Sequence, residues 1–497
     1  MPSVAQAVLR SWAIPPAATF AIVLSALVYL RGWWLLRRAG SPDAPPWRAV
    51  TFLIGLFTLW FALASPMDVF NGLVLTAHML QHMLLMMVAP PLILLGAPLV
   101  PMVRGLPIFA AREFAGPFLN WSVAKRVGGA LTHPVVALLL MGLAMFAWHT
   151  PALYELALRS STWHQVEHAC FFLTSIIFWW PVVQPWPSRA QWPRWAMVPY
   201  LLIADLENTA LSAILTFSDR VLYPSYAVVP RLFGLSALED QVAAGAIMWV
   251  VGSLAFVVPA VIIAVQCLSR KSARPEIAVA RKHYRSFDEA LPTFSEVIAP
   301  VPRFLRARLT TRRLEAVSFA LLFIAVGFSF VRFLSSSSDD DDQALRFAGT
   351  SGSFAVAVFA PAGDLAAGPS RFSVLVQDLG SREVLLDAAV ELSAHPAAGL
   401  QASSTIAQAS YEDSENKLLQ SAELNLSTAG DWTVDVIVRH NSRAVEFLMP
   451  LHAVKGEVGI EFPWSYAVFF TLAAVLLLTY IRRHRTPKTC TSLPRLA

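Results

Sequence analysis

The chain has 497 residues, of which 56% are hydrophobic and only 14% carry a charge. This composition is too apolar for a water-soluble protein, and several runs are long enough to cross about 30 Å of hydrocarbon. The formal net charge is +5, but the basic residues gather between the apolar runs, where membrane orientation and contact with anionic lipid account for them. The composition therefore indicates a polytopic membrane protein and gives no reason to expect nucleic-acid binding.

Long apolar runs recur along the chain, and each could cross a membrane as a helix at about 1.5 Å per residue. A basic segment, residues 269–313, separates the first seven runs from the last two. The sequence therefore predicts a mainly α-helical protein with a seven-helix transmembrane body over residues 1–268 and a C-terminal module with two further spans. The runs are 15–36, 48–65, 72–98, 133–150, 164–186, 195–216, 241–268, 314–334 and 463–481.

Lysine and arginine predict the orientation of the body, because they stay on the cytoplasmic side during insertion. They are concentrated after the first, third, fifth, seventh and ninth runs, which all lie on one side of the membrane if the N-terminus lies outside. We therefore expect an external N-terminus and a cytoplasmic C-terminus. The external connections 66–71, 151–163 and 217–240 contain only Arg159, Arg220 and Arg231.

The C-terminal module combines polar, alternating and apolar segments. A serine and aspartate run cannot form a core and indicates a solvated linker. Short stretches of alternating apolar and polar residues follow, separated by turns, and predict a small extracytoplasmic antiparallel β-sandwich of the immunoglobulin-like kind. The expected parts are a helix at 314–334, the linker 335–344, the β-domain 345–460, a helix at 461–482 and a basic cytoplasmic tail at 483–497.

Two histidines, His78 and His82, lie one helical turn apart inside the third apolar run. Ionisable residues within a membrane are energetically expensive and usually mark a function, and at this spacing the two rings share one helix face. The same spacing recurs at His164 and His168, and the predicted topology brings His149 to the same end of the body. We therefore expect these five histidines to form one polar cluster near the outer face.

The cluster could bind a metal ion. The three cysteines form no Cys-x-x-Cys motif and leave the β-domain without a disulfide, so any metal site must use histidine and methionine. Neutral imidazoles and thioethers are soft ligands suited to Cu(I), although each methionine alone is as well explained by packing. The predicted copper ligands are His78, His82, His149, His164, His168, Met79 and Met83, with Glu155, Glu167 and Asp240 orienting the rings without binding the metal.

A series of short motifs follows one another through residues 50–268. They include His78-Met79-Leu80-Gln81-His82-Met83, Ala89-Pro90-Pro91, Trp148-His149-x-Pro151-x-Leu153-Tyr154, His164-x-x-Glu167-His168, Trp179-Trp180-Pro181, Tyr223-Pro224-x-Tyr226 and Asp240-Gln241. In these motifs the chain resembles the CtaG family of bacterial cytochrome c oxidase assembly factors. The resemblance implies a non-enzymatic, seven-span inner-membrane protein that is needed to build a haem–copper oxidase and handles copper for it.

The β-domain resembles small immunoglobulin-like domains of the YtkA and FixH type in one short stretch, Ala429-Gly430-Asp431-Trp432-Thr433-Val434. That resemblance implies an accessory role beside oxidase or copper proteins. A second metal site in this domain would draw on His395, His440, Met449 and His452, although histidines on the surface of a sandwich usually bind nothing.

Three functional classes remain open from the sequence. In the first, an assembly factor takes up Cu(I) from a periplasmic copper donor and passes it to an oxidase subunit. In the second, the histidines hold haem in a membrane redox protein, although pairs separated by only about 6 Å of helical rise cannot serve two haems. In the third, the protein transports copper or another small solute, which the intramembrane residues Asp205 and Glu207 favour.

Overall fold

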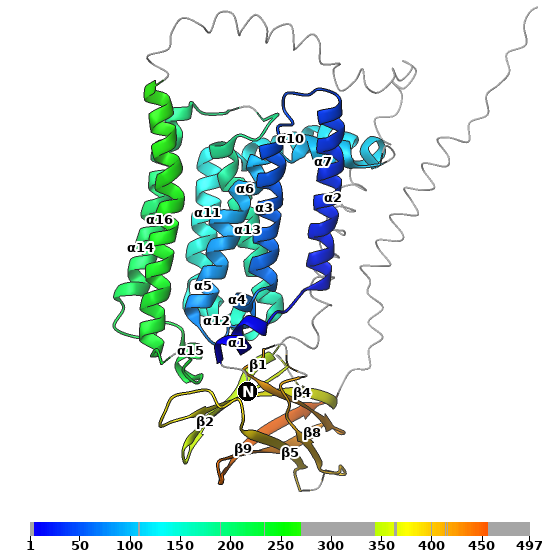
Figure 1. The fold of residues 1–497 in the computed structure, drawn as a ribbon, viewed down its shortest axis with the longest axis vertical. Coiled ribbons are helices and arrows are strands. Elements are labelled where there is room, and N and C mark those ends of the chain that lie inside the picture. The colour runs from blue at the N-terminus through cyan, green and yellow to red at the C-terminus, as the bar shows by residue number, and fades with distance from the viewer. Residues whose placement is uncertain are drawn as a thin grey trace, which may run out of the picture. The chain divides into compact units, whose positions relative to one another are not determined.

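The computed structural model describes residues 4–107, 110–188, 190–232, 234–269, 343–361, 365–398, 400–412, 414 and 416–455. These residues form a helical body and a set of β-strands (Figure 1). The predicted helices at 314–334 and 461–482, the tail 483–497 and nearly all of the linkers 269–313 and 335–344 lie outside the described residues.

Apolar helices make up the body, and most of them run roughly parallel to one another in Figure 1. Among the described residues, six helices are long and apolar enough to cross a membrane, or seven if one bent pair counts as a span. This finding confirms a multi-pass membrane protein, and each of the first seven predicted runs falls on one of these spans. The six are Pro16–Arg38, Pro46–Val69, Leu75–Leu95, Ser161–Val183, Arg194–Phe217 and Ala237–Ser269.

Prolines begin many of these helices, because a proline in the first turn lacks only an N–H that would have no helical partner. Within the spans lie α2 (Pro16–Arg38), α3 (Pro46–Ala64), α4 (Pro66–Val69), α5 (Leu75–Met83), η1 (Leu84–Val88), α6 (Ala89–Leu95), α13 (Ser161–Val183), η3 (Arg194–Ala196), α14 (Met197–Phe217) and α16 (Ala237–Ser269). The other helices are α1 (Val4–Arg10), α7 (Leu99–Gly105), η2 (Ala111–Ala115), α9 (Gly116–Asn120), α10 (Ser122–Leu131), α11 (Pro134–Trp148), α12 (Pro151–Arg159) and α15 (Pro224–Val228).

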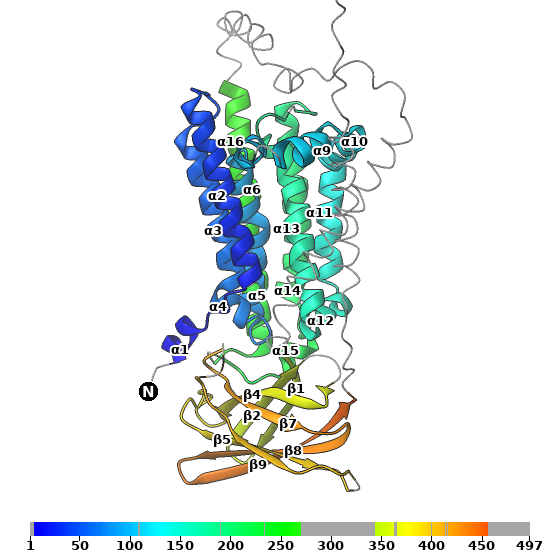
Figure 2. The same ribbon diagram turned by 90° about the vertical axis from the view of Figure 1, so that its right-hand side faces the viewer.

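The fourth predicted span, 133–150, is shorter and more bent than expected. The helix α11 has only 15 residues, and it meets α10 at an angle of 67° (Figure 2). The break falls at His133, which precedes Pro134 and is extended, because the residue before a proline is held away from helical geometry. The sequence therefore predicted the apolar run correctly and missed the bend.

The third span contains a π-helix, η1, between α5 and α6. Pro90 has no N–H to offer the carbonyl of Met86 four residues earlier. The indole Nε1 of Trp179 on α13 donates to that carbonyl instead, at 3.0 Å. A residue from the neighbouring helix thus stabilises the irregular turn, and such turns are frequent next to functional sites.

Two sheets form the β-domain, and their strands share one apolar core that includes Phe354, Phe372 and Trp432 (Figure 2). One sheet has the order β1-β2-β4-β7 and the other β3-β9-β8-β5-β6. All pairs are antiparallel except β3 with β9. The predicted β-structure is confirmed, and its immunoglobulin-like type stays a prediction. The strands are β1 (Gln343–Ser351), β2 (Phe354–Pro361), β3 (Leu365–Ala366), β4 (Gly368–Asp378), β5 (Ala389–Pro396), β6 (Thr405–Gln408), β7 (Gln420–Leu426), β8 (Gly430–His440) and β9 (Arg443–Val454).

Candidate metal centre

Three places in the helical body supply the histidines. The helix α5 carries His78 and His82, α13 carries His164 and His168, and His149 ends α11. On α5 and on α13 the two rings are four residues apart and therefore share one face. The histidine pairs thus face each other because both of their helices pack into the same interior.

The structure brings the five predicted histidines together. The ring centroids of His78 and His82 are 4.2 Å apart, and those of His164 and His168 are 4.1 Å apart. Between the two helices, His78 lies 5.2 Å from His164 and His82 lies 5.5 Å from His168. His149 joins from the side, 6.5 Å from His82.

Glu167 lies among the rings rather than behind them. Its Oε2 is 3.7 Å from Nε2 of His78, and its Oε1 is 3.9 Å from Nε2 of His82. One ligand atom from each of His78, His82, His164 and Glu167 falls within 4.8 Å of all the others. Ligand atoms around a tetrahedral metal with bonds of 2.0–2.1 Å are about 3.3 Å apart. Small side-chain movements would therefore let this carboxylate bind a metal directly, beyond the orienting role predicted for it.

The polar atoms of the cluster are buried without hydrogen bonds. His78, His82 and Glu167 are at most 1% exposed. Within the part of the chain that the structure describes, both ring nitrogens of His78 and His82 and both oxygens of Glu167 have no hydrogen-bond partner. Buried polar groups are normally hydrogen-bonded, because an unpaired one costs about 1–3 kcal/mol. Such a concentration of unpaired donors and acceptors indicates a site built for a ligand.

His149 shows which of its nitrogens faces that site. Its Nδ1 lies 2.8 Å from the carbonyl oxygen of Met145. A carbonyl only accepts, so Nδ1 carries the proton and Nε2 keeps its lone pair. Nε2 is buried without a hydrogen-bond partner among the described residues. A backbone carbonyl that fixes the tautomer in this way is a common arrangement behind metal-binding histidines.

Aromatic rings close the surroundings of the cluster. The ring of Tyr154 lies 5.1 Å from His78, and that of Phe171 lies 4.7 Å from His82. Tyr223 stacks on Tyr154 at 3.9 Å and donates a hydrogen bond to the carbonyl oxygen of His149. The cluster is therefore enclosed by apolar rings whose hydroxyl groups hold the adjacent loops.

The two predicted methionine ligands lie beside the cluster. Met79 is fully buried and Met83 is 3% exposed, and both belong to an apolar core that also holds Met145. This packing surrounds the histidines with thioethers, and metal binding by Met79 and Met83 stays a prediction.

Glu155 and Asp240 were expected to orient the rings, and the structure gives them other partners. Glu155 accepts hydrogen bonds from the backbone and hydroxyl of Ser225 and from Arg159. Asp240 accepts from the backbone N–H groups of Leu75 and Thr76, at 2.7 and 3.1 Å, and from the Thr76 hydroxyl. The carboxylate of Asp240 thus stabilises the first turn of α5 and positions the histidine pair through the backbone.

A carboxylate that sequence reasoning missed, Asp68 on α4, lies beside the second histidine pair. One ligand atom each from Asp68, His164 and His168 falls within 4.8 Å of the other two. Gln81, also missed, donates to Oδ1 of Asp68 at 2.6 Å and to the Ala62 carbonyl at 2.9 Å. A signal was present in the sequence, since Asp68 is the acidic residue in the short connection 66–71 that leads into the histidine helix.

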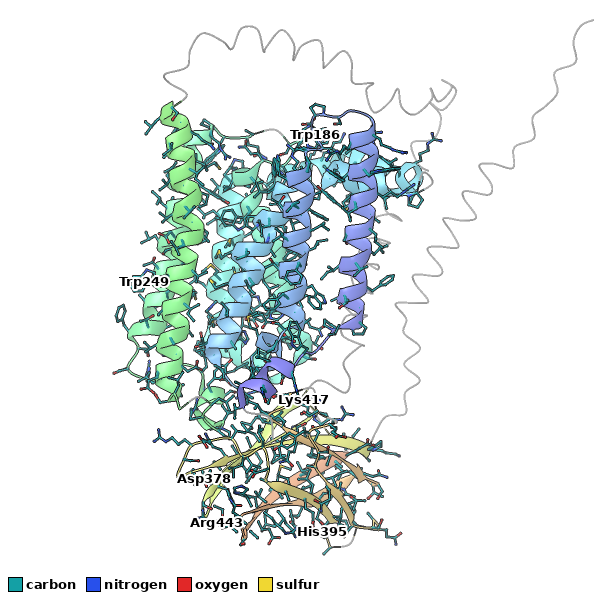
Figure 3. All side chains as sticks on the ribbon, viewed as in Figure 1. Trp186, Trp249, Asp378, His395, Lys417 and Arg443 are labelled. Carbon is teal, nitrogen blue, oxygen red and sulfur yellow. The ribbon has the colours of Figure 1, made fainter. Side chains whose placement is uncertain are left out.

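The other predicted residues lie apart from this centre. His133 packs against Trp192 at 5.7 Å, as expected for a separate residue. In the β-domain, His395 (Figure 3), His440 and His452 each lie against the carboxylate of a different aspartate, and Met449 is part of the core. Among the described residues, the metal-capable groups of histidine and acidic side chains lie in the helical body.

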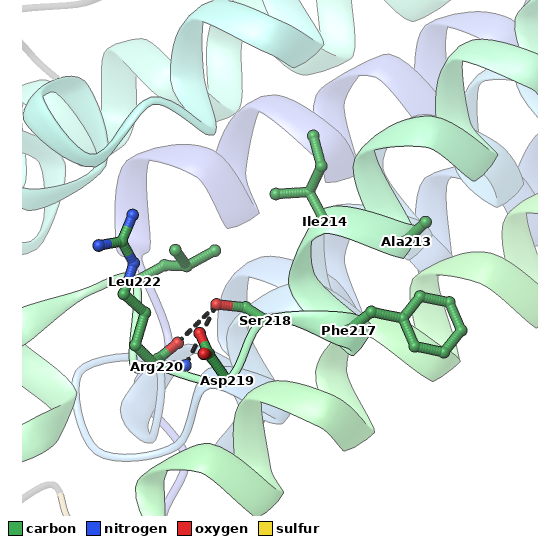
Figure 4. Close-up of a pocket in the computed structure, with 7 residues that line it drawn as sticks. All are labelled: Ala213, Ile214, Phe217, Ser218, Asp219, Arg220 and Leu222. Atoms are coloured by element: carbon green, nitrogen blue, oxygen red, sulfur yellow. Dashed lines mark hydrogen bonds between the residues drawn. The ribbon is translucent and has the colours of Figure 1, made fainter.

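A pocket of about 560 Å³ at the end of α14 is also distinct from the centre (Figure 4). Ser218 and Arg220 hydrogen-bond to each other at its floor. Its lining residues are Ala213, Ile214, Phe217, Ser218, Asp219, Arg220 and Leu222. They include no histidine and only one carboxylate, so the pocket offers no comparable donor set.

Most of the helical body matches a known protein family. Residues 27–270 match the family described as cytochrome c oxidase caa3 assembly factor, Caa3_CtaG. This region, just under half of the chain, is similar to the Caa3_CtaG family. The match contains the whole histidine cluster together with Glu167, Asp68 and Asp240, so the centre is part of the Caa3_CtaG region.

Similar curated proteins are uncharacterised. Proteins of Mycobacterium bovis and Mycobacterium tuberculosis are each 27% identical over 296 residues, which is 58% of this chain and 43% of theirs. A Mycobacterium leprae protein is 30% identical over 273 residues, which is 54% of this chain and 40% of its own. The chain thus spans about two fifths of the length of these relatives. No solved structure matches it.

Proposed function

We propose that this protein is a membrane assembly factor for a haem–copper cytochrome c oxidase, and that the histidine cluster binds a copper ion for delivery to an oxidase subunit. The Caa3_CtaG match of residues 27–270 supports the assembly role, which requires no catalysis by the protein itself. The distribution of lysine and arginine supports an inner-membrane location with the cluster toward the periplasm. A periplasmic copper donor would then supply the metal from that side.

The observation that carries the metal proposal is the set of buried, unpaired nitrogen and oxygen atoms around His78, His82 and Glu167. A bound cation would satisfy one nitrogen of each ring and the carboxylate together, since a neutral imidazole offers one lone pair and a carboxylate offers its oxygens. Imidazole suits copper, zinc and iron, and the methionines around the cluster favour copper among these.

The number of donors also suits delivery. A small metal ion in such a site binds about four ligands, whereas the cluster offers five imidazoles and the carboxylate of Glu167. Surplus ligands let the ion exchange one bond at a time, so that it can leave without first losing all of its ligands. A carrier needs this property more than it needs maximal affinity.

The close packing of the rings favours a single metal ion over haem. A haem would separate its two axial histidines by the macrocycle, whereas His78 contacts His82 edge-on at 4.2 Å. The transport alternative is also weaker, because the carboxylate of Asp205 accepts a hydrogen bond from Ser253 at 2.7 Å and that of Glu207 lies against Gly142. A hydrogen bond thus accounts for the place of Asp205, and Glu207 lies at a helix contact.

The test is copper analysis of the detergent-purified full chain after exposure to Cu(I), beside the His78→Ala/His82→Ala double variant. We expect stoichiometric copper in the parent protein and loss of it in the double variant. Membranes of a host that depends on this protein should lose assembled oxidase with the same double variant, measured by its haem spectrum and oxygen consumption.

His133→Ala is the matched control, because His133 is also a histidine at a span of this body but packs against Trp192 away from the cluster. It should keep both copper and oxidase. A parent protein that binds no copper, or a double variant that still matures the oxidase, would contradict the proposal.

A further inference from the structure

We propose that Asp68, His164 and His168 form a second metal site, a loading site, where the ion binds before it moves to His78, His82 and Glu167. This inference rests on the proposed copper function. It adds a position and an order of events that the histidine cluster alone does not give.

Burial distinguishes the two sets of ligands. His78, His82 and Glu167 are at most 1% exposed and cannot meet an ion that arrives from water. Asp68 and His164 are half-buried, and His168 is 8% exposed. Asp68 and His164 are therefore the least buried of the candidate ligands, and an incoming ion would meet them first, although Nε2 of His164 and of His168 is itself buried.

One shared residue connects the two sets. His164 belongs to the group with Asp68 and His168, and also to the group with His78, His82 and Glu167. Its ring lies 4.1 Å from that of His168 and 5.2 Å from that of His78. An ion held by His164 can thus exchange Asp68 for an inner ligand while it stays bound to protein throughout.

The carboxylate of Asp68 gives the loading site its charge. Gln81 holds it in place by donating to Oδ1 at 2.6 Å, and the same amide donates to the Ala62 carbonyl. Gln81 directly precedes His82, so one turn of α5 positions both the outer carboxylate and an inner ligand. A negative charge beside the ligands attracts a cation and raises its rate of association.

Loading kinetics of the full-length apoprotein test the order of events. Cu(I) is supplied from a chromophoric chelator, and its transfer is followed by stopped-flow absorbance for the parent, Asp68→Asn and Asp219→Asn. Asparagine keeps an oxygen that can accept from Gln81 and removes the charge, so the fold is retained. We expect Asp68→Asn to load roughly tenfold more slowly than the parent but to reach the same final copper content. Its rate should also lose the salt dependence that the charge confers.

Asp219→Asn is the control, because it removes a carboxylate from the pocket at the end of α14 and should load at the parental rate. Parental loading kinetics in Asp68→Asn would overturn the loading site. A final copper content in Asp68→Asn as low as in His78→Ala/His82→Ala would also overturn it, because Asp68 would then be a ligand of one common site. Failure of the proposed function is separate, since then the parent itself binds no copper.

Discussion

Two buried polar regions lie along the first turns of α5, and they differ in whether their side-chain polar atoms are hydrogen-bonded. At the start of α16, Asp240 accepts from two backbone N–H groups, and Gln241 bonds to Leu222, Leu215 and Arg220. At the histidine cluster, the ring nitrogens of His78 and His82 and the carboxylate oxygens of Glu167 have no hydrogen-bond partner among the described residues. Burial alone therefore does not distinguish the candidate site, whereas the gathering of several unpartnered atoms in one place does.

The largest loss of stability should follow from removing Asp240, whose carboxylate is hydrogen-bonded. Asp240→Ala leaves the N–H groups of Leu75 and Thr76 without an acceptor at a buried helix end, which should lower the free energy of unfolding by about 2–4 kcal/mol. Thermal unfolding of the apoprotein in detergent measures this change. Asp240→Asn keeps one acceptor oxygen, so its melting temperature should lie between those of the parent and Asp240→Ala. An unchanged melting temperature in Asp240→Ala would show that its hydrogen bonds add no stability.

Removing a ring from the histidine cluster should affect stability much less than removing Asp240. His78→Leu removes a buried ring whose Nε2 lies 3.7 Å from Glu167, beyond hydrogen-bonding distance, so the free energy of unfolding of the apoprotein should change by no more than about 1 kcal/mol. The same variant should bind copper at least roughly tenfold more weakly, because it lacks one ligand. Unfolding and Cu(I) competition titrations are measured on one preparation, and strong destabilisation without weaker copper binding would show that the ring is structural.

Trp179→Phe tests a single paired contact. The variant keeps an aromatic ring and removes the N–H that serves the Met86 carbonyl. We expect a loss of about 1–2 kcal/mol in unfolding free energy, because that carbonyl becomes unpaired next to Pro90. Hydrogen exchange of η1 should increase as well, whereas Trp249→Phe, on α16, is the control that should leave η1 exchange unchanged (Figure 3).

The smallest effect should come from the paired charges of the β-domain. Hydrogen bonds from Arg439 and then Gln408 lower the pKa of Glu391. This carboxylate therefore adds a little stability above its ordinary pKa, and that contribution disappears as the pH falls through the lowered value. Glu391→Gln should melt slightly below the parent at neutral pH and together with it in acid. A difference that persists in acid would need another cause.

Hydropathy and histidine spacing predicted much of this molecule. The apolar runs correspond to the spans. The basic loops predicted that the histidine ends of the third and fifth runs lie on one side, and His78 and His164 do lie close together. Those arguments need only local sequence and topology. Distances between helices do not follow from them, which is why Asp68 was missed and Glu167 was placed behind the rings.

Two further features could not be predicted from the sequence. The sequence could not show that Asp240 stabilises the first turn of a helix 165 residues away. Nor did the length of the run 133–150 reveal its bend, because hydropathy measures apolar length and not direction. The contact of Asp240 joins segments that are distant in sequence, and the bend depends on the backbone geometry of His133 alone.

The π-helix has a consequence for evolution of the third span. A π-turn contains one residue more than the α-turn it replaces, and each residue of a helix adds about 100° of rotation. Deleting a single residue from Leu84–Val88 would therefore return this turn to α geometry, shorten the span by only about 1.5 Å, and leave His78 and His82 in nearly the same direction relative to Pro90 and Pro91. The π-turn thus absorbs one residue without changing the phase between the histidines and the prolines, whereas a deletion within the regular helix Leu75–Met83, between the histidines and this turn, would change that phase by about 100°.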